Sequence, residues 1–288
     1  MASTLPLGGR TRLAPTPSGY LHAGNAFNFL VTQRLARLAG SRVVLRIDDL
    51  DMERARPEYI EDIFRSLEWL EIRWDEGPSG PGELARSWSQ QFRVERYRIL
   101  LDRLAKEGQL YDCSCSRSTL AVLRQSGRPH SCSSATGHSV DPRSALRLRS
   151  PEPCPVKTRD IHGSVLEHDL SSLMEDPILC QRDTGRPSYQ IASLSDDQEM
   201  GVTFVVRGED LFPSTVCQVH IAEVLGLEGF TSIRFLHHHL TVGNDENKLS
   251  KSAGADSLRA MRLAGKGPRE LFDQADRFVE DLFITSGT

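Results

Sequence analysis

Two polar segments far apart in the chain have the composition of a phosphate-binding site. Residues 15–25 read Pro-Thr-Pro-Ser-Gly-Tyr-Leu-His-Ala-Gly-Asn, and residues 248–252 read Lys-Leu-Ser-Lys-Ser. The first segment precedes apolar residues at helical spacing, which predicts a helix start with free backbone N–H groups facing an anion. His22 can donate to phosphate oxygens, and Gly24 lets a ring or a phosphate approach the backbone. The two lysines of the second segment suit a clamp on leaving phosphates.

Each segment alone is more often an ordinary turn or a solvated loop. Their combination predicts a nucleotide site closed from two sides, and the elements around them agree. Short apolar runs alternate with helical patterns, which indicates a parallel α/β core. Strands are expected at residues 43–47, 202–206 and 233–242, and helices after residue 25, at 57, after 89, at 213–225 and from 268.

The composition fits a cytoplasmic enzyme. The 39% hydrophobic content is enough for a core, and no apolar stretch is long enough to span a membrane. Residues 1–10 lack the apolar centre of a signal peptide, and six cysteines in 288 residues do not indicate a secreted disulfide scaffold.

The net charge of −4 gives no overall field that attracts RNA, so any RNA contact must use local patches. Arg143, Arg147 and Arg149 form one such patch. The alternation of Arg147 and Arg149 fits the polar face of a strand equally well.

Four motifs in this order resemble those of class I aminoacyl-tRNA synthetases. Residues 12–24 resemble the "HIGH" region in its glutamyl form, and residues 248–252 are similar to the "KMSKS" loop. Between them, Leu-Arg-Ile-Asp-Asp-Leu-Asp at 45–51 and Val-Arg-Gly-Glu-Asp-Leu at 206–211 are similar to two further glutamyl-type motifs. Chain length and a Cys-x-Cys pair at residues 113–115 point to one subfamily, the glutamyl-queuosine tRNA(Asp) synthetases, which are truncated glutamyl-tRNA synthetase paralogues.

The resemblance implies a Rossmann-type nucleotide-binding parallel sheet with an inserted, zinc-binding subdomain. We expect residues 1–110 to form the first half of the catalytic domain and residues 169–288 the second half. Residues 111–168 are rich in Ser, Pro, Arg and His and fit the insertion. No helical anticodon-binding domain is expected after the second half.

The implied chemistry is attack of an amino-acid carboxylate on the α-phosphate of ATP, which releases pyrophosphate. Positioning and charge neutralisation carry such a reaction. His22 and Lys251 would contact the phosphates, with support from Lys248 and Mg²⁺. Three further residues are expected to bind ATP: Gly24, Asn25 and Ser250.

The same motifs imply a glutamate pocket. Arg207 would pair with the substrate side-chain carboxylate, which a guanidinium binds bidentately, and Arg12 would be a second cationic anchor. An arginine in isolation is more often a surface charge, and only the motif reverses that reading. The remaining expected glutamate contacts are Ala14, Thr16, Asp48 and Tyr189.

Asp48 departs from the glutamyl pattern. Glutamyl enzymes usually have Ile-Glu-Asp where residues 47–49 read Ile-Asp-Asp, and glutaminyl enzymes also use Asp-Asp there. Arg207 still favours an acidic substrate, because an arginine facing a neutral amide lacks a counter-charge. Glutamate is therefore the expected substrate, with glutamine as the alternative.

A zinc site is expected in the insertion. The resembling subfamily binds zinc through Cys-x-Cys, a tyrosine and a later cysteine, and Cys113, Cys115 and Cys132 match its cysteines. Arg128 occupies the tyrosine position and cannot ligate, so we expect His130 as the fourth ligand, with His138 as a substitute. Three thiolates and one imidazole are an ordinary tetrahedral set. The alternative is a degraded site with reduced thiols.

Three consecutive histidines at residues 237–239 also suggest a metal. They lie in an expected strand, where adjacent side chains face opposite sides, so they cannot share one site. We assign them to packing or solvent.

The expected function is ATP-dependent activation of glutamate and its transfer to queuosine in the anticodon stem-loop of tRNA(Asp), by a monomer. One alternative is an ATP-dependent ligase that uses a non-tRNA acceptor. Another is a catalytically inactive tRNA-binding paralogue, against which the intact His22, Lys251 and Arg207 argue.

Overall fold

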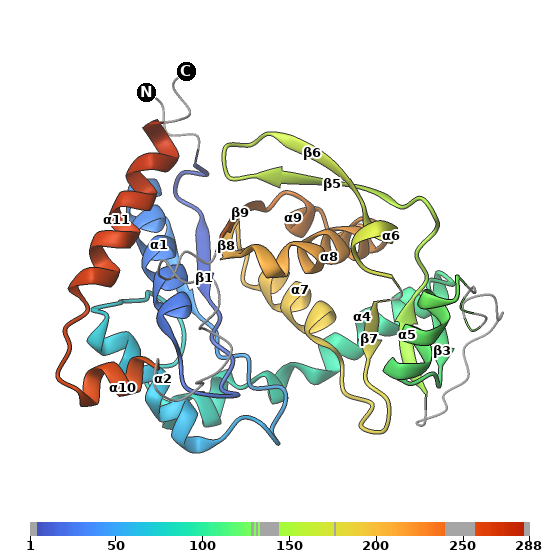
Figure 1. Cartoon of the computed structure of the whole chain (residues 1–288), viewed down its shortest axis with the longest axis horizontal. Helices are drawn as coiled ribbons and strands as arrows, with labels where there is room; N and C mark the ends of the chain where they lie inside the picture. The colour runs from blue at the N-terminus through green and yellow to red at the C-terminus, as the bar shows by residue number, and fades with distance from the viewer. Residues whose placement is uncertain are drawn as a thin grey trace.

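A parallel α/β core lies at the centre of the protein (Figure 1). The computed structural model describes residues 5–127, 130, 132, 144–175, 177–239 and 257–284. Strand β1 (Arg10–Leu13) pairs in parallel with β2 (Arg42–Leu45). Strand β8 (Phe204–Gly208) pairs in parallel with β9 (Arg234–His238). The Thr203 N–H donates to the Arg10 carbonyl at 2.8 Å, which brings β8 beside β1. The predicted α/β class with a parallel sheet is confirmed.

Helices cover this core and carry its crossover connections. Helix α1 (Ala23–Ala39) links β1 to β2 and ends where Gly40 takes a left-handed conformation with φ 60°. Helix α11 (Arg269–Ile284) lies alongside α1 (Figure 1), and apolar residues of both join one core with β1 and β2. Helix α8 (Phe212–Leu225) connects β8 to β9, and α7 (Tyr189–Glu199) precedes β8. Two more helices lie near the start of α1: α2 (Pro57–Trp69) and α10 (Leu258–Leu263).

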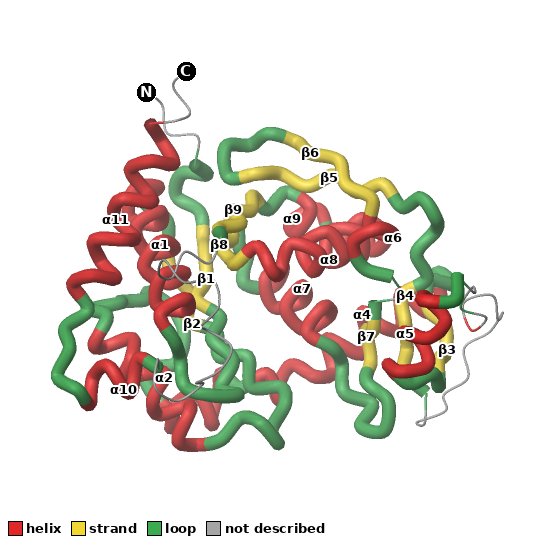
Figure 2. The backbone as a smooth tube through the Cα atoms, in the orientation of Figure 1, coloured by secondary structure: helices red, strands yellow, loops and turns green. Residues whose placement is uncertain are grey.

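A second, antiparallel sheet lies away from α1 (Figure 2). It contains β3 (Leu110–Cys113), β4 (Ala145–Leu148) and β7 (Ile178–Cys180), with α5 (Arg117–Gln125) after β3. Helix α4 (Val94–Lys106) runs from the α/β core toward this sheet. The short elements are α3 (Pro81–Glu83), a π-helical turn (Leu84–Trp88), two 3₁₀ turns (Gln90–Arg93 and Glu209–Leu211), α6 (Leu170–Leu173) and α9 (Glu228–Thr231).

The strand pairings cross the predicted domain boundaries. Strand β5 (Pro155–Asp160), inside the expected insertion 111–168, pairs in parallel with β9 of the core and antiparallel with β6 (Val165–Asp169). Conversely, β7 follows residue 168 but pairs with β4. The three-part division therefore stays a prediction, and the sheets themselves are shared between its parts.

The predicted elements are found with small shifts. The helix expected after Ser89 begins with the 3₁₀ turn, whose Gln91 N–H donates to Ser89 Oγ at 3.2 Å, and the α-helix follows from Val94. The strand expected at 233–242 covers Arg234–His238, and residues 240–242 lie outside the described part. Among the described residues, no helix is long and apolar enough to cross a membrane.

Candidate active site

A cavity of about 640 Å³ opens where β1 and β8 end and α1 begins. Every expected ATP or glutamate residue that the structure describes lines it: Arg12, Ala14, Thr16, His22, Gly24, Asn25, Asp48, Tyr189 and Arg207. The other three, Lys248, Ser250 and Lys251, lie outside the described residues. Because these residues line one cavity, they could act on the same ligands, and the role assigned to each of them stays a prediction.

His22 caps the first turn of α1. The Gly24 N–H donates to His22 Nδ1 at 3.1 Å, and the His22 N–H donates to the Asn25 side-chain oxygen at 3.0 Å. A neutral His22 ring that accepts at Nδ1 carries its proton on Nε2. Desolvation lowers the pKa of His22, although the charge of Asp210 opposes the shift.

This cap corrects one expectation. The sequence predicts free N–H groups at the helix start, but Gly24 donates to the His22 ring, and the Asn25 and Ala26 N–H groups donate to the His22 carbonyl at 2.9 and 3.2 Å. The capping box uses these donors because His22 and Asn25 have the spacing that closes it. The Nε2–H of His22 is a side-chain donor that the cap leaves available to a phosphate.

Arg207 projects from β8 into the cavity and is only 2% exposed. Its Nη1 donates to Thr215 Oγ1 at 3.2 Å and to Gln218 Oε1 at 3.1 Å. Its guanidinium lies 5.5 Å from the ring centre of Phe235. Within the described residues, its Nε and Nη2 have no hydrogen-bond partner. A buried guanidinium with free donors matches a carboxylate ligand.

Behind the cavity wall lies a buried network of charges. Arg12 Nε donates to the two carboxylate oxygens of Asp197 at 3.2 and 3.4 Å. Arg46 Nη1 donates to Asp197 at 2.6 Å, and Arg46 also donates to both oxygens of Asp48 at 2.6 and 3.1 Å. Arg207 Nη2 lies 4.0 Å from Asp197. Asp196 also lies 3.9 Å from Arg46 and pairs with Arg93. By formal charge, four guanidinium groups face three carboxylates, so the cluster keeps one net positive charge.

The pKa values of Asp48 and Asp197 are shifted in opposite directions. Burial raises the pKa of Asp48, because the single partner Arg46 does not fully compensate for it. Burial also acts to raise the pKa of Asp197, but Arg12, Arg46 and Arg207 outweigh it and lower that pKa. Asp197 is therefore the firmly ionised centre of the cluster.

Arg46, Asp197 and Gln218 were missed by the sequence interpretation. Charged residues are usually exposed, so Arg46, directly after β2, gave no signal in the sequence. Asp197 gave none either, because its burial is visible only in the structure. Asp196 and Asp197 stand together inside the otherwise buried helix α7, where unpaired acids would be costly. Asp196 accepts from Arg93 at 2.7 Å, from Tyr97 at 2.9 Å and from Gln90 at 2.9 Å, and it lies 3.9 Å from Arg46.

A further wall of the cavity was also not predicted. Arg186 Nη1 donates to Asp51 at 2.8 Å and Nη2 donates to Gln181 at 2.9 Å, and all three residues line the cavity. This ion pair joins the loop before α7 to the loop after β2.

The three histidines at residues 237–239 do not share a site, as predicted. His237 Nε2 lies 2.8 Å from Thr215 Oγ1, whereas His238 Nε2 accepts from Asn28 at 3.0 Å on the other side of β9. His239 contacts Glu209. Burial and the nearby Arg207 lower the pKa of His237 to about 3, so it stays neutral.

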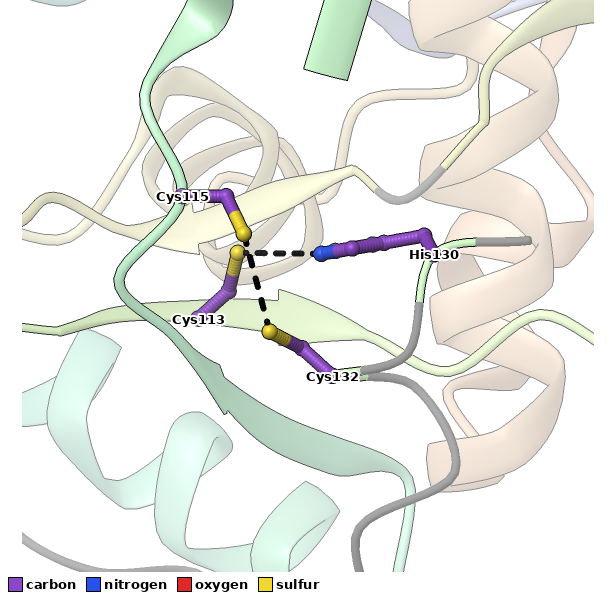
Figure 3. Close-up of side chains that lie close together, drawn as sticks. All are labelled: Cys113, Cys115, His130 and Cys132. Carbon is purple, nitrogen blue, oxygen red and sulfur yellow. Dashed lines mark hydrogen bonds between the residues drawn. The ribbon is translucent and has the colours of Figure 1, made fainter. Parts of the chain in front are cut away.

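Cys113, Cys115, His130 and Cys132 point toward one another at the end of β3 (Figure 3). Their four possible ligand atoms all lie within 4.8 Å of one another. Cys113 Sγ lies 3.4 Å from His130 Nε2, and Cys115 Sγ lies 3.7 Å from Cys132 Sγ. Arg128 and His138 lie outside the described residues.

These spacings fit a zinc ion. Zinc–sulfur bonds of about 2.3 Å and zinc–nitrogen bonds of about 2.0 Å in a tetrahedron separate two sulfurs by about 3.8 Å and sulfur from nitrogen by about 3.5 Å. Burial and the neighbouring Cys115 and Cys113 raise the pKa of Cys132 to about 12. Thiolates this close repel one another, and a divalent cation removes that repulsion.

Comparison with known proteins agrees with this geometry. The family model of class I tRNA synthetases (E and Q), catalytic domain, matches residues 9–277. The chain is 35% identical over 280 residues to the glutamate–tRNA ligase of Coprothermobacter proteolyticus and 36% identical over 272 residues to that of Sulfurihydrogenibium sp.. These matches cover 92% and 89% of this chain but 57% and 55% of the relatives, so the chain spans about half their length.

Two solved structures are similar in fold. A glutamate-tRNA synthetase from Elizabethkingia anophelis matches with a TM-score of 0.69 and 26% identity, covering 85% of this chain and 53% of that one. A glutamate tRNA ligase from Elizabethkingia meningosepticum, in complex with its amino acid, matches with a TM-score of 0.64 and 25% identity, covering 81% and 49%. The cavity, the order of its motifs and these matches agree: the chain belongs to the class I tRNA synthetase family of the E and Q type and contains its catalytic domain.

Proposed function

We propose that this protein activates glutamate with ATP and transfers it to queuosine in the anticodon of tRNA(Asp). The observation that carries the first half is Arg207, which lines the cavity and whose buried Nε and Nη2 lack hydrogen-bond partners in the described residues. A buried donor pair without an acceptor costs free energy unless a ligand supplies one.

The charge of the site favours glutamate over glutamine. The cluster keeps one net positive charge, which the second carboxylate of a dicarboxylic amino acid neutralises. Glutamine would leave that charge uncompensated in a buried setting. Asp48 and Tyr189 line the same cavity and would contact the substrate amino group and backbone.

The ATP side rests on α1 and on the two ends of the segment that carries Lys248, Ser250 and Lys251. Before the segment, His238 lines the cavity. After it, Ser257 forms a backbone bridge with His22, and the Leu258 N–H donates to the Leu21 carbonyl at 2.7 Å. This supports phosphate contacts from both lysines together with His22, and Mg²⁺ supplies further charge neutralisation when bound with ATP.

We also propose that zinc is held by Cys113, Cys115, Cys132 and His130. The donor set and its spacing support this, and the ion would fix the loop after β3 by joining residues far apart in sequence. Its role is structural, since four protein ligands leave no open position.

The acceptor is proposed on the subfamily resemblance, above all the Cys-x-Cys pair. Because the net charge is −4, RNA binding must use local contacts, and transfer is expected to fall with salt. The monomeric state and the cytoplasmic location stay predictions.

One experiment tests both the activation of glutamate and its transfer to tRNA. The protein is incubated with ATP, labelled glutamate and tRNA(Asp) that contains queuosine, and the tRNA is then digested with nuclease. Label on the anticodon fragment is the expected result. Label on the terminal adenosine would indicate a minimal glutamyl-tRNA synthetase. Glutamate-dependent pyrophosphate exchange without labelled RNA would indicate a non-tRNA acceptor, and no exchange would indicate an inactive paralogue.

A further inference from the structure

We propose that Asp197 is a positioning residue that sets the preference of the cavity for an acidic over a neutral amino-acid side chain. The inference rests on the proposed function, because it concerns how the same cavity selects its amino acid. It assigns this selection to a residue outside the cavity lining.

Asp197 lies behind the cavity wall and touches both cationic anchors. It is fully buried on α7, whereas Arg12 and Arg207 line the cavity from the neighbouring strands β1 and β8. Its carboxylate accepts from Arg12 at 3.2 Å and lies 4.0 Å from Arg207. A third contact, from Arg46 at 2.6 Å, fixes the carboxylate from behind.

Two guanidinium groups in one buried wall repel each other. Burial lowers the pKa of Arg12, and the positive charges of Arg207 and Arg46 lower it further, whereas Asp197 raises it. The carboxylate thus offsets the repulsion between the two arginines and holds them close enough to act on one ligand. The free Nε and Nη2 of Arg207 then keep a fixed direction, which bidentate carboxylate recognition requires.

The Asp197→Asn variant removes this counter-charge with almost no change in side-chain size. If Asp197 acted only through net charge, the more positive site would bind glutamate more tightly. If Asp197 positions the arginines, their repulsion displaces them and glutamate binding weakens. The structure favours the second outcome, because the single carbonyl oxygen of an asparagine side chain could not replace both carboxylate oxygens that the arginines now share.

The test measures pyrophosphate exchange with glutamate and with glutamine as substrates. For Asp197→Asn, we expect the KM for glutamate to rise roughly 10- to 100-fold, as for loss of a buried charge-assisted hydrogen bond. The KM for ATP and the kcat at saturating glutamate change little, and the preference for glutamate over glutamine falls. Asp196→Asn is the comparison variant, because Asp196 is equally buried and lies 3.9 Å from Arg46, but accepts its hydrogen bonds from Arg93, Tyr97 and Gln90 rather than from Arg12. It is expected to keep the preference.

A second variant separates position from charge and does not depend on how Asp197→Asn folds. Asp197→Glu retains the charge but moves the carboxylate by one methylene. Loss of the preference in Asp197→Glu supports positioning, whereas full retention overturns it. Circular dichroism and thermal unfolding confirm that each assayed variant is folded.

Failure of this inference is distinguishable from failure of the proposed function. Absence of glutamate-dependent exchange in the unchanged protein contradicts the proposed function. In that case, equilibrium binding of glutarate, a simple dicarboxylate, to the unchanged protein and to Asp197→Asn still tests the inference. Unchanged or tighter binding of glutamate or glutarate by Asp197→Asn overturns it.

Discussion

Replacing Arg207 with glutamine tests whether its guanidinium selects the substrate. The change removes one positive charge and leaves the cluster with no net charge. It also removes the Nε and Nη2 donors, which have no hydrogen-bond partner among the described residues. Since Nε and Nη2 would both bind the substrate carboxylate, the variant should bind glutamate more weakly and ATP as before.

The expected rise in the KM for glutamate follows from loss of the two hydrogen bonds that Nε and Nη2 would donate to the substrate. Charge-assisted hydrogen bonds contribute about 1.5 to 3 kcal/mol each, and part of this is offset by desolvation of the substrate carboxylate. A net loss of about 2 to 4 kcal/mol corresponds to a rise of roughly 30- to 1000-fold in the KM for glutamate. Stability should change little, because the hydrogen bonds to Thr215 and Gln218 that are lost are balanced by removal of a buried charge.

Pyrophosphate exchange as a function of glutamate and of ATP concentration measures both effects. Arg42→Gln is the matched control, since its side chain is 64% exposed and pairs with Glu76 on the surface. A glutamate KM that is unchanged in Arg207→Gln would refute the reasoning. So would better exchange with glutamine than with glutamate in the unchanged protein, and Asp48 would then be the better guide to the substrate.

Three further predictions concern the metal, the phosphates and pH. Protein purified without chelators should contain about one zinc per chain by elemental analysis. His130→Ala should weaken zinc retention, whereas His162→Ala, outside the cluster, should not; zinc that survives His130→Ala unchanged points to another fourth ligand. Lys251→Ala should slow pyrophosphate exchange by roughly 100-fold, as for loss of a charge-stabilising donor, and an unchanged rate argues against a phosphate contact. The pKa of His237 falls from 6.5 to about 3 on folding, so between these values the unfolded chain binds more protons and stability is lost as pH falls. His237→Gln should therefore make the free energy of unfolding less dependent on pH in this range, which denaturant titrations at several pH values measure.

The fold class could be predicted from local patterns, and nine residues of the cavity lining from the motifs that carry the family resemblance. Helix α1 could be placed from its apolar spacing. The cysteine cluster could be proposed because the subfamily resemblance matched its three cysteines, and His130 completed an ordinary zinc set. Where a motif carried the signal, the structure brought its residues together in one cavity.

Long-range partners could not be predicted in the same way. Nothing near Arg46 in the sequence indicates that it pairs with Asp197, which lies 151 residues further on. The sequence also did not indicate that β5 pairs with β9 and β7 with β4, across the predicted boundary at residue 168. Strand pairing depends on tertiary packing rather than on local pattern. The hydrogen bonds of the Gly24 and Asn25 N–H groups to His22 were not predicted, because His22 was interpreted only as a phosphate donor and not as a helix cap.

The pairing of Arg12 with Asp197 joins residues 185 positions apart and therefore constrains how the chain folds. During synthesis, Arg12 on β1 and Arg46 directly after β2 emerge long before α7, and their guanidinium groups stay hydrated until Asp197 is present. Closing so long a loop is slow, and contacts of this separation form late. We therefore expect this side of the cavity to form only when α7 docks against β1. Recovery of ligand binding during refolding should then report on that docking, and we expect helix formation measured by circular dichroism to precede it.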